Sequence, residues 1–458
     1  MADELKDSPA AARSTRERLG AVLGRPQEAL SPWVLRRTLR ELRHVADPTV
    51  SDVEGGRRAA GVAGWYAKAT PEQRRDCWLL MSEQFAPDSA AIQSAREAYE
   101  AALGSDDEAQ AEVRLRRAIT APRTRLLQRF AAFPDGVRFL VDLRAELLPQ
   151  LKSNKRLLAL DAELEELFST WFDVGFLELR RISWDSPASL IEKLIKYEAV
   201  HDIRSWADAK NRLDQDRRCY GFFHPRLPGE PLIFVEVALL RELAAGITPL
   251  LDEDAEAADL QKATTAIFYS ISNTQRGLRG VSFGDSLIKR VVETLHGEFP
   301  QLKTFATLSP IPGLRAWLGR QAQRLLDELP ARSRSALARE LGEAQATAPA
   351  LLAVLDRVAE LDEKSAVRRW LKGAAARFLA TELDDESRPL DAVARFHLGN
   401  GARVERINWL ADPSAKGLRQ SHGLMVNYLY DLKRLDKHRA QLAQGQIPVS
   451  SAVESLLD

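Results

Sequence analysis

The chain has 458 residues, enough for two or three domains of ordinary size. Hydrophobic residues make up 45% of the chain and charged residues 28%, as is typical of globular proteins with sizeable cores. The 65 basic residues balance the 65 acidic residues, so no global charge draws the chain to nucleic acid or to an anionic membrane.

The lack of a recognisable targeting signal and the low number of cysteines favour a cytoplasmic protein. Residues 1–20 lack the apolar core of a secretory signal, and apolar stretches such as 232–240 are too short to cross a membrane. The two cysteines, Cys77 and Cys219, imply no disulfide framework. The final residues, SLLD, are not a peroxisomal address. We therefore expect a cytoplasmic location and no membrane contact.

The sequence pattern of residues 1–170 predicts a series of helices, with no strong strand pattern and no cluster of catalytic residue types. Apolar residues recur at helical spacing toward the end of this half: Leu157, Leu160, Leu164, Leu167, Phe168 and Trp171. The sequence predicts an all-helical domain over 1–170 that serves packing or oligomerisation.

The pattern changes near Asp173 to short apolar runs that alternate with helices. Ser186 and Pro187 are expected to open the first of these helices as its N-cap and first residue. Strands are predicted within 174–184, 231–240, 263–273 and 303–313, a helix over 285–296, and further helices between 313 and 395. This alternation predicts an α/β domain over 171–458 whose sheet is at least partly parallel.

A glycine-rich loop joins the strand 263–273 to the helix that follows it. Its glycines are Gly277, Gly280 and Gly284, and Arg276 and Arg279 add positive charge. Glycines allow close backbone approach, and a helix N-terminus attracts phosphate, so the loop suits a pyrophosphate. It matches neither the phosphate-binding loop of NTPases nor the Rossmann spacing. It resembles the CoA pyrophosphate loop of the GNAT acyltransferases, although the residues alone leave an ordinary turn equally open.

Two further residues stand out as candidates for chemistry. Ser309 ends a predicted strand, and His397 precedes the tight-turn dipeptide Asn400-Gly401. Taken alone, a serine that caps a proline-rich turn and a buried structural histidine remain open for these two positions. The histidines and cysteines show no metal-ligand spacing, so we expect no metal.

The sequence stretches around these features resemble one family, the malonyl-CoA decarboxylases. The resemblance covers residues 170 to 430 and is loose in the helical half. It rests on the stretches GFLELRRISWDSPA (175–188), FFHPRLPGEPLIFVEVAL (222–239), AIFYSISNTQRGLRGVSFGDSLIKRVV (266–292), FPQLKTFATLSPIPG (299–313) and ARFHLGNGARVERINWLADPSAKGLRQSHGLMVNYLY (394–430).

The resemblance implies a helical domain followed by a catalytic domain with the GNAT fold and helical insertions. It also implies a homo-oligomer, commonly a tetramer, that works without metal or organic cofactor. The family's catalytic serine falls on Ser309 and its catalytic histidine on His397. Its malonyl-CoA loop falls on Arg279, Gly280, Val281, Ser282, Phe283, Gly284 and Asp285.

The implied reaction converts malonyl-CoA to acetyl-CoA and CO2 through a thioester enolate. The thioester is the electron sink, so we expect no cofactor. We expect His397 to protonate the α-carbon or to hydrogen-bond the oxyanion, and Ser309 to bond His397 or the malonyl carboxylate. Two alternatives remain: a GNAT-type acyltransferase that needs an acceptor, and a malonyl-CoA sensor that binds without turnover.

Overall fold

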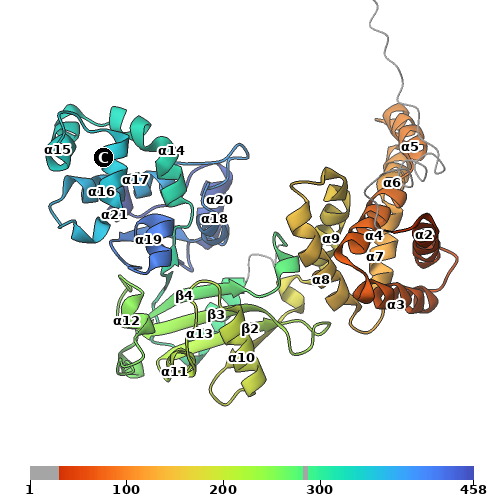
Figure 1. Ribbon diagram of the computed structural model, residues 1–458, viewed down its shortest axis with the longest axis horizontal. Helices are drawn as coiled ribbons and strands as arrows, with labels where there is room; N and C mark the ends of the chain where they lie inside the picture. Colours follow the sequence, from red (N-terminus) through yellow and green to blue (C-terminus); the bar gives the residue numbers. More distant parts are fainter. Residues whose placement is uncertain (1–29, 282–286, 458) are drawn as a thin grey trace, which may run out of the picture. The chain divides into compact units, whose positions relative to one another are not determined.

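The computed structural model describes residues 30–281 and 287–457, which form two compact units. The first unit contains the chain up to Phe176, together with 224–228 and a loop segment that begins at Gln275. The second unit contains the rest of the described chain, including all the strands (Figure 1). The predicted domain boundary between residues 170 and 171 stays a prediction.

The first unit is helical. Its α-helices are α2 (Pro32–Ala46), α3 (Asp52–Lys68), α4 (Pro71–Gln84), α5 (Ser89–Ala102), α6 (Glu108–Ile119), α7 (Pro122–Phe130), α8 (Gly136–Leu147) and α9 (Leu158–Trp171). The short 3-10 helices are η1 (Leu148–Gln150), η2 (Lys155–Leu157), η3 (Val174–Phe176) and η5 (Arg276–Leu278). Side-chain oxygens cap several of the helices. Thr70, for example, forms a capping box with Gln73 at the start of α4.

The apolar stripe predicted in α9 faces the interior of this unit. Leu160, Leu164 and Phe168 are fully buried, and Phe168 packs edge-on against Phe172. Arg144 of α8, with only 1% of its surface exposed, pairs with Asp161 and Glu165 of α9. A buried arginine requires partners for its charge and its donors, and those partners tie α8 to α9 and to η5.

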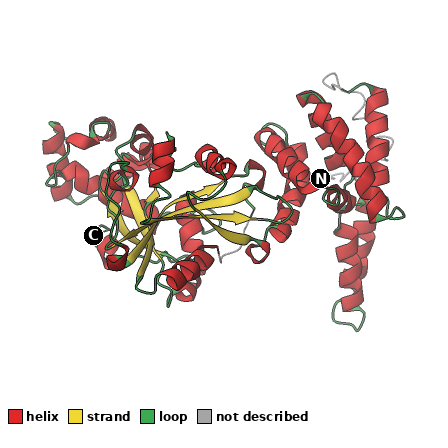
Figure 2. Ribbon diagram, turned by 90° about the horizontal axis from the view of Figure 1, so that it is seen from below, coloured by secondary structure: helices red, strands yellow, loops and turns green. Residues whose placement is uncertain are grey.

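The second unit is built on one mixed sheet of eight strands (Figure 2). Its strand order is β1-β2-β3-β4-β5-β8-β6, and β7 pairs with β8 beside this path. The strands are β1 (Glu178–Ile182), β2 (Arg217–Phe223), β3 (Pro231–Leu240), β4 (Thr265–Asn273), β5 (Thr304–Thr307), β6 (Ser309–Pro310), β7 (Arg403–Asn408) and β8 (Met425–Leu429). Neighbours are antiparallel except for the parallel pair β4 and β5, which α13 (Leu287–Glu298) connects.

Helices cover this sheet through apolar contacts. Isoleucines and leucines of α10 (Ala188–Tyr197), Ile203 of the loop after it and Ala209 of α11 (Trp206–Asn211) pack on β1, β2 and β3. A second cluster joins β3, β4 and β5 to α12 (Thr248–Leu251). The remaining short 3-10 helices of this unit are η4 (Leu260–Lys262) and η6 (Val358–Glu360).

Between β6 and β7 the chain forms a group of helices, drawn in cyan and blue in Figure 1. They are α14 (Leu314–Asp327), α15 (Ala331–Leu341), α16 (Ala348–Leu355), α17 (Ala366–Ala380) and α18 (Ala392–Gly399). Three more follow: α19 (Ala415–Ser421) precedes β8, and α20 (Leu435–Ala443) and α21 (Ser451–Glu454) come after it.

The expected order is confirmed: a helical unit precedes a mixed α/β domain with helical insertions. The GNAT topology of that domain stays a prediction. Two details differ from the sequence prediction. The segment 303–313 is split into β5 and β6, and α10 begins at Ala188 with Pro187 as its N-cap residue. The Ser186 hydroxyl instead accepts a hydrogen bond from the Ser183 amide, closing the turn before the helix. In the described chain, no helix combines the length and the apolar character needed to span a membrane.

Candidate active site

Strands β4 and β5 run together for only four residue pairs, from Thr265 and Thr304 to Phe268 and Thr307. Strand β4 then continues to Asn273. The segment that follows β5 turns away instead and pairs with β8 as strand β6, where Ser309 lies opposite Val426. Ser309 therefore lies where two parallel strands part. Open sheets place ligands outside the carboxyl ends of such diverging strands.

Helix α18 carries His397 in its last turn. Asp391 caps the helix by accepting hydrogen bonds from the amides of Val393 and Ala394, and it also accepts one from the amide of Gly313. One carboxylate thus ties the start of α18 to the turn that follows Ser309. At the other end Gly401, with φ +84°, closes the predicted Asn400-Gly401 turn.

These elements bring Ser309 and His397 together. The Ser309 hydroxyl oxygen lies 3.2 Å from His397 Nε2 and 2.8 Å from the Thr307 hydroxyl oxygen. On the other side of the ring, His397 Nδ1 lies 2.7 Å from the Tyr430 hydroxyl. The ring also stacks on Tyr428 at a centroid distance of 4.7 Å. Four side chains from β5, β6, α18 and the end of β8 form one hydrogen-bonded chain.

Burial keeps this histidine neutral. His397 is 4% exposed, and desolvation lowers its pKa to about 3. Burial also raises the pKa of Tyr430, which therefore keeps its proton. At neutral pH both groups are uncharged hydrogen-bonding partners.

The hydrogen bonds assign the ring proton. The Ser309 hydroxyl has one hydrogen and donates it to Thr307, whose oxygen also accepts from the Tyr428 amide. His397 Nε2 must then donate to the Ser309 oxygen, and Nδ1 accepts from the Tyr430 hydroxyl. In this tautomer Ser309 is an acceptor, so His397 does not activate it as a nucleophile.

The described part of the predicted CoA loop packs in the helical unit. Arg144 donates to the carbonyl oxygens of Gly277 and Arg279, at 2.9 and 2.8 Å. Arg279 and Gly280 are exposed, Val281 is buried, and Gly280 has φ +86°. Residues Ser282, Phe283, Gly284 and Asp285 lie outside the described residues. Within the described chain the side chains of Arg276 and Arg279 make no ion pair, so their charges are available to an anion.

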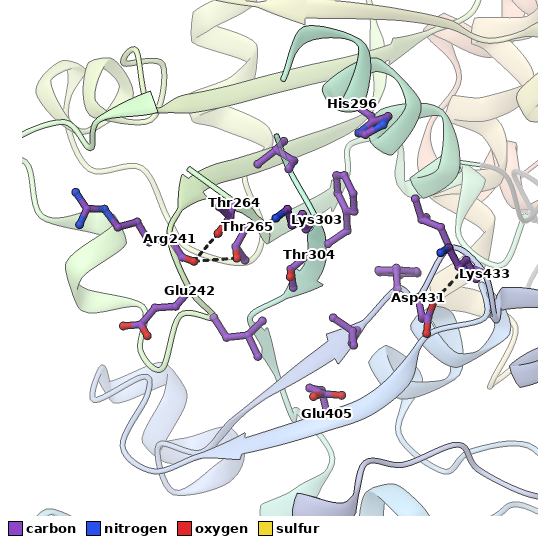
Figure 3. Close-up of a pocket in the computed structure, with 16 residues that line it drawn as sticks. Arg241, Glu242, Thr264, Thr265, His296, Lys303, Thr304, Glu405, Asp431 and Lys433 are labelled. Atoms are coloured by element: carbon purple, nitrogen blue, oxygen red, sulfur yellow. Dashed lines mark hydrogen bonds between the residues drawn. The ribbon is translucent and has the colours of Figure 1, made fainter. Parts of the chain in front are cut away.

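A cavity of about 910 Å³ opens beside Tyr430, at the starts of β4 and β5 (Figure 3). Basic and acidic side chains surround it, including Arg241, Lys303, Glu405 and Asp431. Neither Ser309 nor His397 lines this cavity. Its mixed charge shows no preference for one sign of ligand.

Sequence reasoning missed two members of the hydrogen-bonded chain. Thr307 is two residues before Ser309, and such spacing places side chains on one face of a strand, which was a usable signal. Tyr430 had no local signal, because only the pairing of β8 brings it to His397. Among the residues described, no group of three or more histidine, cysteine or carboxylate side chains is placed to hold a metal ion.

Comparisons with known proteins identify the family of this chain. The family model described as "Malonyl-CoA decarboxylase C-terminal domain" matches residues 175–458, and the corresponding N-terminal domain model matches 85–172. The mitochondrial malonyl-CoA decarboxylase of Anser anser anser is 38% identical over 363 residues, covering 76% of this chain and 72% of its own. The enzyme of Mus musculus is 38% identical over 367 residues, with coverage of 76% and 73%.

Solved structures give the same result over nearly the whole chain. Malonyl-CoA decarboxylase from Rhodopseudomonas palustris aligns with a TM-score of 0.80 at 41% identity, covering 92% of this chain and 99% of its own. The protein from Cupriavidus metallidurans aligns with a TM-score of 0.75 at 43% identity, covering 93% and 100%. The chain described here therefore belongs to the malonyl-CoA decarboxylase family.

Proposed function

We propose that this protein decarboxylates malonyl-CoA to acetyl-CoA and CO2 at Ser309 and His397. The observation that carries the proposal is the buried chain Tyr430–His397–Ser309–Thr307, placed where β4 and β5 part in a member of this family. Malonyl-CoA loses CO2 when the bond between its carboxylate carbon and its α-carbon breaks. The electron pair then moves onto the thioester as an enolate, which takes one proton at the α-carbon.

His397 serves this reaction in two steps. As a neutral donor it shares its Nε2 hydrogen between the Ser309 oxygen and the developing enolate oxygen, and a donor of this kind contributes about 3–4 kcal/mol. A malonyl carboxylate beside the ring opposes desolvation and favours the imidazolium, because an opposite charge raises a histidine pKa. Each turnover consumes one solvent proton: the ring takes it up to become the imidazolium, which then gives a proton to the α-carbon and returns to the neutral state. Tyr430 holds the ring from the other side.

Ser309 orients the substrate and the ring. Its oxygen accepts from His397, and its own hydrogen is shared with Thr307. When substrate enters, this hydroxyl can turn from Thr307 to the malonyl carboxylate without leaving His397 unpaired. Holding the carboxylate perpendicular to the thioester plane aligns the breaking bond with the electron sink, which is a positioning effect.

The loop Arg279, Gly280, Val281, Ser282, Phe283, Gly284 and Asp285 is assigned to the CoA pyrophosphate as part of this proposal. Arg276 and Arg279 make no ion pair with any residue that the structure describes, and their charges support the assignment. So does the positive φ of Gly280, which leaves its backbone open to close approach. Cytoplasmic location, tetrameric assembly and an oligomerisation role for residues 1–170 are also proposed. Cell fractionation and light scattering of the full chain and of its C-terminal half test them.

The first experiment incubates chelator-treated protein with malonyl-CoA alone in D2O and follows the CoA species by mass spectrometry. We expect acetyl-CoA that carries one solvent deuterium, with His397→Asn about 10²–10⁴-fold slower and CoA affinity within about twofold of the parent protein. Unchanged malonyl-CoA would refute the proposal. Turnover only with an added amine would indicate an acyltransferase, and binding without turnover would indicate a sensor. Ser309→Ala should also lose most of its turnover.

A further inference from the structure

A second groove lies in the helical part of the second unit, lined by residues of α14, α15, α17 and the segment after α21. Figure 1 labels α14, α15 and α17 in this group of helices. Its volume is about 1070 Å³, the size of cavities that hold small organic ligands. The proposed reaction uses none of its residues.

The groove has an apolar floor. Trp370, Leu325 and Leu337 are buried at its base, and the half-buried Leu329 and Leu456 extend it. Small residues of α17 (Ala366, Gly373 and Ala374) leave room above that helix. The C-terminal segment forms one wall, since a Cβ on Gly373 would lie 3.1 Å from the Leu456 carbonyl oxygen. An aliphatic chain fits such a floor because it removes apolar surface from water.

The rim of the groove is basic. Five of its side chains are cations and one is an acid: Arg332, Arg368, Arg369, Lys372, Arg377 and Glu363. Three of the cations have partners. Arg377 pairs with Glu328, Arg368 lies 3.6 Å from Glu363, and Arg369 donates to the Lys364 carbonyl.

Lys372 and Arg332 have no hydrogen bond or ion pair within the residues described here. Lys372 is half-buried, and desolvation together with the neighbouring Arg368 lowers the pKa of its ammonium group. A partly desolvated cation without a counter-charge is unfavourable, so an anion that enters the groove gains the interaction that the fold leaves unmade.

We infer that this groove binds a long-chain fatty acid anion, with the aliphatic chain on the floor and the carboxylate paired to Lys372. Arg332 adds to the attraction at the rim. An apolar chain that ends in one negative charge matches both the leucine and tryptophan floor and the excess of basic over acidic side chains. This binding site is separate from the one at Ser309 and His397.

Calorimetric titration of the full chain with dodecanoate, below its micelle concentration, tests the inference. We expect one saturable site per chain and at least about tenfold weaker binding of octanoate, because each buried methylene contributes to affinity. Lys372→Met keeps the length of the side chain and removes its charge, and it should weaken dodecanoate binding about tenfold or more. Lys437→Met, on the exposed face of α20 outside the groove, should bind like the parent protein.

Dodecyltrimethylammonium carries the same aliphatic chain with the opposite charge and should not bind. Equal binding of the two amphiphiles would reject the role of charge. Equal dodecanoate affinity in the Lys372→Met and parent proteins would also reject the site, provided that thermal unfolding shows both to be folded. Absence of saturable binding by any fatty acid, or selective capture of an acidic peptide in its place, would overturn the inference and leave the decarboxylase proposal untouched.

Discussion

Substituting Gly277 with alanine should destabilise the loop that carries Arg279. An added Cβ would lie 1.9 Å from the Val141 carbonyl oxygen and 2.7 Å from its carbonyl carbon. Real Cβ contacts start near 3.0 Å, so η5 and α8 must separate by about 1 Å. Both opposing atoms belong to the backbone, and no side-chain rotation relieves the clash.

The separation also disturbs Arg144, which donates to the carbonyl oxygens of Gly277 and Arg279. Overpacking costs about 1–3 kcal/mol, and weakening hydrogen bonds of a buried charged group adds about 1.5–3 kcal/mol. The expected loss of unfolding free energy is therefore about 3–5 kcal/mol, which lowers the melting temperature by roughly 10 °C for a unit of this size.

Urea unfolding followed by circular dichroism measures this loss. Gly61→Ala is the matched control, because a Cβ at this position in α3 meets nothing within 4 Å and removes a flexible residue from a helix. It should gain about 0.5–1 kcal/mol. Gly277→Ala should also raise KM for malonyl-CoA more than it lowers kcat. Stability of Gly277→Ala within about 0.5 kcal/mol of the parent protein would refute the argument.

Three further outcomes are expected. Tyr430→Phe leaves His397 Nδ1 without its partner at 2.7 Å and should lower kcat about tenfold or more with CoA binding unchanged; unaltered kcat would remove Tyr430 from the site. Arg144→Met leaves Asp161 and two carbonyl groups without their buried donor and should cost about 3–5 kcal/mol in urea unfolding, against under 1 kcal/mol for the exposed Arg96→Met. Between pH 6.5 and about 3 the unfolded chain protonates His397 and the folded chain does not, so stability falls as pH falls, by up to about 1.4 kcal/mol per unit. The urea midpoint of His397→Gln should therefore change less between pH 7 and 5.5 than that of the parent protein, and equal changes would contradict the buried neutral state.

The sequence by itself determined the features that depend on local periodicity and on short sequence motifs. The apolar stripe of α9 and the buried face of α13 follow from spacing, because a helix repeats its buried side at a fixed interval. The strands at 231–240 and 265–273 follow from short, dense apolar runs, as expected of strands that are buried on both faces. Ser309 and His397 were singled out as candidates from the sequence motifs that surround them, and their catalytic roles stay a prediction. Strands β2, β7 and β8 were not predicted, although the aromatic run of β2 offered a signal.

Tertiary structure alone decided what these residues do to one another. Thr307, Ser309, His397 and Tyr430 come from separate elements, and only the pairing of β8 with β5, β6 and β7 places them within hydrogen-bonding distance. The neutral state of His397 has the same origin, since burial in the folded chain lowers its pKa. Hydrogen bonds and desolvation act over a few ångströms, so they depend on which distant segments the fold brings together.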